Sequence, residues 1–199
     1  MTKHSPPVQA FTASELLAVM ASRLLKDGQI VFAGIGIPLL AATLAQRNSA
    51  PHLTILFEGG TIGPFIVPGE LPPSTNEQRC TRRSNMVLPI TDVLLLLQRG
   101  YVDVGFMGGA QIDRFGNLNS SFIGDADNPK IRLPGTGGGN DISSLTDMIV
   151  AMKHEKRRFS CFMATIMLVR EEMSLPPPVP GRRILGLSAS PMNEELRLP

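Results

Sequence analysis

Four clusters of glycine, each at or soon after an apolar run, constrain this chain more than any other feature. They lie at 34–36, 59–60, 105–109 and 135–139, in a chain of 199 residues that holds nineteen glycines. Glycine lets another molecule approach the backbone closely, and it adopts conformations that are closed to other residues. An apolar run followed by a glycine turn, repeated along one chain, predicts buried strands whose ends meet at a ligand site.

The segments around these clusters predict an α/β protein with an open, mostly parallel sheet flanked by helices. Apolar residues recur at helical spacing after Thr12, which forms a capping-box pattern with Glu15, and Gly28 is expected to stop that helix. The elements expected next are a strand over 29–33, a helix from Pro38 to Gln46, and a strand that ends at Glu58. This order forms a parallel unit with a right-handed crossover.

The rest of the chain to about residue 159 continues the alternation. The expected elements are a helix over 93–98 capped by Thr91-Asp92, a strand over 102–107, a turn over 114–117 with Gly or Asn at positive φ, a short helix capped by Asp141 or Ser143, and a last strand over 148–152. The alternation at 102–104 indicates an edge or half-exposed strand. The connection from Gly63 to Asn85 is long for a compact domain, which is typical of a functional or mobile segment.

Composition narrows the class of protein. The hydrophobic content of 43% and the charged content of 18% indicate a globular chain of one domain. A net charge of +2 gives no argument for nucleic acid. The two cysteines form no disulfide framework and no metal-ligand spacing, and the first residues contain no apolar signal-peptide core. No apolar run is long enough to span a bilayer, so we expect a cytoplasmic protein that binds neither membrane nor metal.

Glu58 is the first candidate for chemistry. It ends an apolar run and is followed by Gly59 and Gly60, whereas a buried strand does not normally end in an acid. Open α/β folds bind their ligands at the carboxyl ends of strands. The local pattern is also compatible with an acid at a helix N-terminus or with a solvated turn residue.

Five motifs, in order and in register from about Thr12 to Phe159, extend this observation. They are Gly34-x-Gly36-x-Pro38, Glu58-Gly59-Gly60, the stretch Gly108 to Asn119 with Ser120, Ile123-Gly124-Asp125 and Pro129-Lys130-x-Arg132 after it, Gly135-x-Gly137-Gly138, and His154 to Phe159. Each motif alone is weak, but chance matches would not keep both order and spacing. Together they resemble the β subunit of family I coenzyme A transferases, of the glutaconate and 3-oxoadipate types, and imply the CoA-transferase-like fold.

The resemblance assigns roles to residues of this chain. Glu58 aligns with the family's nucleophile, which attacks an acyl-CoA thioester and then carries CoA as a glutamyl-CoA thioester. The backbone at Gly109 would stabilise the thioester oxyanion, at roughly 3 kcal/mol for each N–H donor. The positions expected to bind CoA or substrate are Gly59, Gly60, Gly108, Gln111, Gly135, Gly137 and Gly138. The family's mechanism uses no bound cofactor; the coenzyme A thioester is itself the substrate.

Several of these residues have simpler interpretations. Gly108-Gly109 also fits an ordinary strand-end turn, and the run 135–139 fits a flexible turn. His154 could act as a general base, but the family's mechanism needs none, and 153–158 also reads as a solvated or interface basic face. Asp113 and Asp125 are expected to stabilise turns. Arg114 and Arg132 are candidates for pairing with substrate or with CoA phosphates.

The resemblance implies a partner. In this family an α subunit completes the site, usually in an α2β2 or related oligomer, with acyl-CoA and a carboxylic acid as substrates. Two alternatives stay open: an acyl-CoA hydrolase subunit on the same fold, acting on ring-cleavage products, and a non-catalytic truncated partner subunit. Sugar-phosphate isomerases share a similar topology, but their acid and base constellation is not evident in this chain.

The match to the family pattern is lost after about Phe159. Residues 1–159 are therefore expected to form the transferase domain, and residues 160–199 an atypical, Pro-rich segment that is truncated or frame-shifted. The run Pro176 to Pro180 suits neither a helix nor an inner strand. An extended tail or surface segment is the simplest interpretation of this region.

Overall fold

A computed structural model describes residues 11–67, 69–113, 116–160 and 185–187. The helices are α1 (Ala13–Ser22), α2 (Ile37–Asn48), α3 (Ile90–Gln98) and α4 (Gly139–Leu145), with short 3-10 turns η1 (Gln78–Thr81) and η2 (Lys156–Arg158). The main-sheet strands are β1 (Ile30–Ala33), β2 (Thr54–Leu56), β3 (Thr61–Ile62), β4 (Met86–Val87), β5 (Val104–Met107), β10 (Asp147–Ala151) and β12 (Leu185–Leu187). Their order across the sheet is β12-β10-β5-β1-β2-β3-β4.

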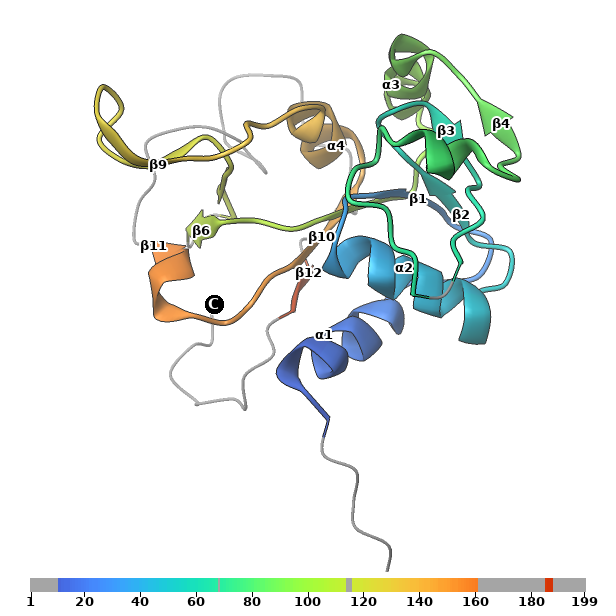
Figure 1. Cartoon of the computed structure of the whole chain (residues 1–199), viewed down its shortest axis with the longest axis horizontal. Coiled ribbons are helices and arrows are strands. Elements are labelled where there is room, and N and C mark those ends of the chain that lie inside the picture. The colour runs from blue at the N-terminus through green and yellow to red at the C-terminus, as the bar shows by residue number, and fades with distance from the viewer. Residues whose placement is uncertain (1–10, 68, 114–115, 161–184, 188–199) are drawn as a thin grey trace, which may run out of the picture.

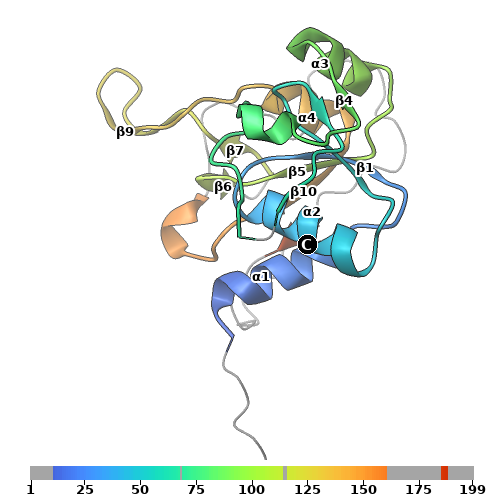
Figure 2. The same ribbon diagram turned by 45° about the vertical axis from the view of Figure 1, so that its right-hand side comes forward.

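The sheet lies between two layers of helices (Figure 1). Helices α1 and α2 cover one face, and α3 and α4 cover the other, as the turned view also shows (Figure 2). The strands from β12 to β2 are parallel, whereas β3 and β4 join as an antiparallel edge. The expected open, mostly parallel sheet flanked by helices is confirmed.

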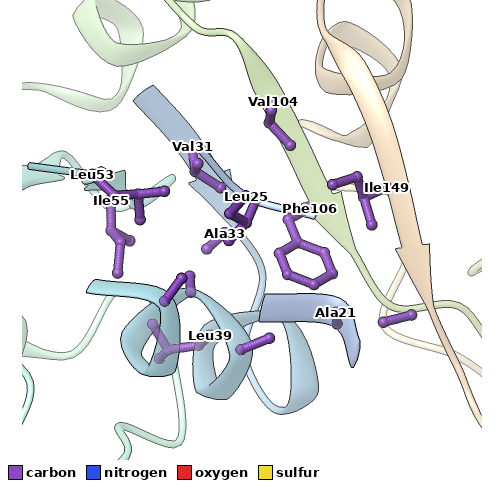
Figure 3. Close-up of a cluster of buried hydrophobic side chains, with 14 of the residues drawn as sticks. Ala21, Leu25, Val31, Ala33, Leu39, Leu53, Ile55, Val104, Phe106 and Ile149 are labelled. Carbon is purple, nitrogen blue, oxygen red and sulfur yellow. The ribbon is translucent and has the colours of Figure 1, made fainter. Parts of the chain in front are cut away.

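Alternation along the central strands builds two hydrophobic cores. Val31 and Ala33 of β1 face α1 and α2 beside Phe106, and Figure 3 shows this cluster gathered over the sheet. Phe32, between them in sequence, faces the α3 and α4 layer together with Val93. Because successive side chains of a strand point to opposite faces, a strand buried on both sides reads as a continuous apolar run.

The expected start of the first helix is confirmed. The Thr12 hydroxyl accepts a hydrogen bond from the Glu15 N–H at 3.2 Å, and the Thr12 N–H donates to the Glu15 carboxylate at 2.7 Å. The helix ends at Ser22, earlier than the apolar spacing indicated, and the chain then turns before Gly28, whose φ is +79°. The turn predicted over 114–117 has Gly116 at φ +87°.

Three other expectations were wrong: the edge position of the strand near 102–104, and the N-caps of two helices. Strand β5 lies inside the sheet, between β1 and β10; the polar residue before it, Asp103, accepts a hydrogen bond from the N–H of Ile30 at 2.7 Å. Helix α3 begins directly after Pro89, so Thr91 and Asp92 lie in its first turn and do not cap it. Helix α4 follows Gly138, so neither Asp141 nor Ser143 is its N-cap.

Strands were also missed. The connection from 63 to 85 lies between β3 and β4, and β10 is not the last strand, because β11 (Phe159–Ser160) and β12 follow it. Strand β12 pairs in parallel with β10, so part of the predicted tail belongs to the sheet. The run Pro176 to Pro180 lies outside the described residues.

Smaller strands extend from the carboxyl end of β5. Strands β6 (Gln111–Asp113) and β7 (Leu118–Asn119) form a hairpin, and β11 pairs in parallel with β6. Strands β8 (Phe122–Gly124) and β9 (Pro129–Arg132) form a second hairpin, which projects from the body in both views (Figures 1 and 2). Within the described residues, no helix combines the length and the apolar character that crossing a membrane would need.

Replacing Phe106 by Ala should destabilise the fold by about 3–5 kcal/mol, because Phe106 is fully buried between β5 and the α1 and α2 layer. Urea unfolding followed by circular dichroism measures this change. Tyr101→Ala is the control, since Tyr101 is 59% exposed and its loss should change stability by no more than about 0.5 kcal/mol. Equal losses in the two variants would contradict this description of the core.

Candidate active site

Glu58 lies two residues beyond the end of β2, in the turn that leads to β3. The Gly60 N–H donates to the Phe57 carbonyl at 3.0 Å, and the Gly60 carbonyl accepts from the N–H of Leu88 at 2.9 Å. The Glu58 side chain is half-buried. The turn therefore fixes the backbone of Glu58 at the carboxyl end of strand β2, as the sequence predicted.

The Glu58 carboxylate reaches the start of α4, eighty positions along the chain. The Gly138 N–H donates a hydrogen bond to Glu58 Oε1 at 2.8 Å. Gly137 has φ +51°, and a Cβ there would lie 2.9 Å from Oε1 and 3.2 Å from Oε2. A Cβ on Gly138 would lie 3.3 Å from Oε1. Glycine at both positions thus makes room for the carboxylate.

Gly59 and Gly60 allow a different close approach. A Cβ on Gly59 would lie 2.7 Å from the Thr75 carbonyl oxygen and 2.5 Å from the Asn76 side chain. Gly60, at φ +101°, lies so close to the Leu88 carbonyl that no side chain fits. Gly59 therefore lets the connection between β3 and β4 lie against the Glu58 turn, and Gly60 lets the segment just after β4 do the same.

A pocket of about 200 Å³ opens beside the carboxylate. This is less than the roughly 300 Å³ at the low end for sites of drug-sized ligands. Its floor is the end of β1, and its walls come from the connection after β3, the end of β5 and the start of α4. The lining residues are Phe32, Ala33, Gly34, Ile35, Glu58, Ser74, Thr75, Met107, Thr136, Gly139 and Ile142. The described residues thus form an open, partial site around Glu58.

The structure separates the other predicted site residues from this pocket. Gly108 and Gly109 follow β5 directly, beyond Met107, and neither lines the pocket. Gln111 is held by its neighbours: its side chain accepts from Asn119 at 2.8 Å and donates to the Arg157 carbonyl at 3.3 Å. The Gly135 N–H donates to the Ser120 carbonyl at 2.7 Å.

The glycine turn after β5 nevertheless lies near the Glu58 turn. Strands β2 and β5 are the two neighbours of β1. Adjacent strands are about 4.8 Å apart, so the ends of β2 and β5 are separated by about 10 Å. The floor between them is Ala33 and Gly34. A group joined to Glu58 can therefore extend across the end of β1 toward Gly108 and Gly109.

The remaining charged candidates have structural partners or lie elsewhere. The Asp113 carboxylate accepts from the N–H of Asn117 at 2.9 Å, and Asp125 accepts from the N–H of Asp127 at 2.8 Å, as expected of turn acids. The His154 ring packs against Phe159 at 4.9 Å. Arg114 lies outside the described residues.

No group of metal-binding side chains is present in the described part of the chain. Ser74 and Thr75 carry no local sequence signal for a site, because nothing in their pattern shows that the connection folds back over Glu58. The pKa of the Cys80 thiol is raised by burial, but Cys80 does not line this pocket.

Comparison with known proteins adds an independent observation. The sequence model of a family described as Coenzyme A transferase matches residues 14–161. The chain is 37% identical to one subunit of the 3-oxoadipate CoA-transferase of Pseudomonas knackmussii, over 90% of this chain and 72% of that protein. It is also 37% identical to one subunit of the glutaconate CoA-transferase of Acidaminococcus fermentans, over 75% of this chain and 57% of that protein.

Solved structures agree on the fold. The crystal structure of glutaconate coenzyme A-transferase from Acidaminococcus fermentans superposes with a TM-score of 0.70 at 35% identity, covering 77% of this chain and 60% of that one. The decarboxylase AibA/AibB superposes with a TM-score of 0.71 at 24% identity, which shows the fold alone. The match to the 3-oxoadipate relative covers 90% of the chain, so it runs beyond residue 160.

Replacing Gly137 by Ala should displace the Glu58 carboxylate from the Gly138 N–H, because the new methyl group would contact both carboxylate oxygens. The amide resonance of Gly138 in a ¹⁵N-labelled protein reports this contact. In the parent protein that resonance should move when Glu58 is replaced by Ala, because the carboxylate acceptor is removed, and in Gly137→Ala this response should be lost.

The matched control is Gly28→Ala. Gly28 also has positive φ, but a Cβ there meets nothing within 4 Å. Both variants should lose roughly 1–2 kcal/mol of stability from the left-handed backbone, and only Gly137→Ala should change the Gly138 resonance. A Gly138 response that survives in Gly137→Ala would contradict the described geometry.

Proposed function

This chain belongs to the coenzyme A transferase family, and from that premise we propose that it supplies the nucleophile Glu58 to a two-subunit enzyme. The enzyme moves CoA between an acyl-CoA and a carboxylic acid through a glutamyl-CoA thioester. The single observation that carries this proposal is the Glu58 carboxylate, held by the N–H of Gly138 at the edge of an open pocket.

The two carboxylate oxygens are not equivalent. Gly138 binds Oε1, whereas no described residue donates a hydrogen bond to Oε2. A carboxylate is a weak nucleophile, so positioning and removal from water are what make it reactive. One oxygen is therefore fixed while the other stays available for attack.

The proposed reaction proceeds by exchange at two carbonyl carbons. Oε2 of Glu58 attacks the thioester carbon, the C–S bond breaks, and CoA leaves as a thiolate, so that the acyl group and Glu58 form a mixed anhydride. The thiolate then attacks the Glu58 carbonyl carbon and releases the donor acid as its carboxylate, which leaves CoA on Glu58. An acceptor carboxylate reverses these steps, takes the CoA and restores Glu58. No oxidant, reductant or net proton is required.

The developing oxyanion needs preorganised donors. Among the described residues, none accepts a hydrogen bond from the N–H groups of Gly109 and Ala110. Fixed backbone donors of this kind contribute about 3–4 kcal/mol each in acyl-transfer sites. Position 109 has no room for a larger residue, since a Cβ there would lie 2.9 Å from the Leu118 side chain. These observations support the role in oxyanion stabilisation that the resemblance assigns to this turn.

The pocket needs a second chain. It is open and too small for a whole acyl-CoA, and the two relatives described above are each named as one subunit of a CoA-transferase. The chain spans 72% and 57% of the lengths of those relatives. We therefore infer an α subunit that covers the open side of the pocket, in a cytoplasmic α2β2 or related assembly.

The proposed substrates are a short dicarboxylate or a 3-oxo acid. Both relatives act, by their names, on acids of this class, glutaconate and 3-oxoadipate. In this chain Ser74 and Thr75 add hydroxyl groups to a wall that is otherwise mostly apolar. Hydroxyl groups near the acyl group provide hydrogen bonds that can distinguish an oxo or carboxyl substituent from a plain alkyl chain.

The division of the chain near residue 160 also stays a proposal. The family match ends at residue 161, which supports a boundary there. Strand β12 pairs with β10 of the main sheet, and the match to the 3-oxoadipate relative runs past residue 160, which argues that part of the following segment continues the domain. Reading the coding DNA in its other frames tests whether the segment is frame-shifted.

Replacing Glu58 by Gln should abolish CoA transfer in the enzyme reconstituted with its α subunit, because an amide cannot form the anhydride. Glu58→Asp should retain about 1% of the parent rate or less, since the shortened side chain misplaces the nucleophile by about 1 Å. Transfer of CoA from an acyl-CoA to a carboxylate acceptor is the measurement.

The control for this pair is Glu70→Gln. Glu70 is an exposed carboxylate on the same connection that covers the site, and it does not line the Glu58 pocket. It should leave the transfer rate unchanged. Full activity in Glu58→Gln would mean that the chain only completes its partner. Turnover with water as fast as with a carboxylate acceptor would show a hydrolase instead.

A further inference from the structure

Arg158, a half-buried arginine, donates hydrogen bonds to the turn between β5 and β6, which is the turn that supplies the proposed oxyanion donors. The Arg158 side chain is 24% exposed, and its Nη1 donates to the carbonyl oxygens of Gly109 at 3.2 Å and of Ala110 at 3.3 Å. These are consecutive carbonyls of the turn between β5 and β6. One guanidinium nitrogen therefore fixes the directions of two adjacent peptide planes.

The arginine is itself held in place. Its Nε donates to the Glu155 carboxylate at 3.3 Å, and the Arg158 N–H donates to the Glu155 carbonyl at 2.8 Å. Arg157 also binds Glu155, at 2.7 Å, and this contact lowers the pKa of Glu155. Pairing of β11 with β6 anchors the segment that follows. The position of Arg158 is thus set by three separate attachments.

The peptide geometry gives these contacts a consequence. In a trans peptide the N–H points away from the C=O of the same plane. The Gly109 carbonyl points at Arg158, so the Ala110 N–H, in the same plane, points the opposite way. The turn between β5 and β6 runs between η2, the orange turn before β11, and α4, in both views (Figures 1 and 2). Seen from η2, α4 lies across this turn in both views, and the start of α4 holds the Glu58 carboxylate.

We propose that Arg158 is a positioning residue, which aims the Ala110 N–H at the acyl oxygen that becomes an oxyanion when Glu58 attacks. This inference rests on the proposed function. The turn has little else to hold it: Gly108 and Gly109 carry no side chain, and the N–H groups of Gly109 and Ala110 bind no described residue. Without the guanidinium, the two peptide planes are free to rotate, and the donor loses its direction. Arg158 itself does not touch the substrate.

The neighbouring arginine offers a matched comparison. Arg157 binds the same carboxylate as Arg158, but its side chain is 77% exposed and makes no contact with the Gly109 or Ala110 carbonyls. Replacing Arg157 removes one ion pair from Glu155 and leaves the hydrogen bonds from Arg158 to the Gly109 and Ala110 carbonyls. Comparing the two positions separates the carbonyl contacts from the general effect of losing a positive charge.

The test measures single-turnover formation of the Glu58 thioester in the complex with the α subunit. Arg158→Gln should slow this step about 100-fold, the effect of losing one oxyanion donor, and leave the KM for acyl-CoA within about twofold. Arg158→Lys should recover part of the rate, because an ammonium can still donate to a carbonyl but lacks the planar fork. Arg157→Gln should match the parent.

The experiment distinguishes failure of the proposed function from failure of the role of Arg158. If the parent enzyme forms no Glu58 thioester, the proposed function fails, and the inference falls with it. If the parent forms the thioester and Arg158→Gln forms it as fast as Arg157→Gln, only the inference is overturned. Circular dichroism at the assay temperature controls for folding. A rate loss in Arg158→Gln that only follows loss of folded protein, with no recovery in Arg158→Lys, also overturns it.

Discussion

The hydrogen bond between the Gly138 N–H and the Glu58 carboxylate is the contact on which this site depends. It joins a turn after β2 to the start of α4, so it forms only when the parallel sheet has placed both at one edge. A carboxylate left in water would be stable but unreactive, whereas one held by a backbone donor at a pocket wall is both fixed and accessible. The glycines at 137 and 138 are required because a side chain would occupy the carboxylate's place.

The rest of the site is also built mainly from glycine backbone. Glycines without side chains lie around Glu58: Gly59 admits the connection between β3 and β4, and Gly60 admits the segment just after β4. The turn at Gly109, about two strand spacings away, presents N–H groups that bind no described residue. Side chains act mainly from behind this layer, as Arg158 does on the carbonyls of Gly109 and Ala110. In the proposed enzyme this arrangement gives rigid donors, and it leaves the acyl group to be recognised by the connection after β3 and by the partner subunit.

Periodicity in the sequence was enough to predict the central α/β order, because strands buried on both faces and capped helices leave local signals, as in the capping box of Thr12 and Glu15. It missed β3, β4 and β12, whose two or three residues each carry too little pattern and are fixed by pairing with distant strands. Glu58 was singled out from its strand end and glycines, and it lines the pocket at the carboxyl ends of the strands. Thr75 and Arg158 were not assigned to the site, since their roles come from contacts with residues far away in the chain.

The most direct test of the account is to map the covalent intermediate. The complex of this chain with its α subunit is treated with acyl-CoA, the thioester is trapped with borohydride or hydroxylamine, and the peptides are analysed by mass spectrometry. We expect modification of one residue, Glu58, in proportion to active sites. An unmodified Glu58 peptide under conditions where CoA is transferred, or a modification at another carboxylate, would contradict it.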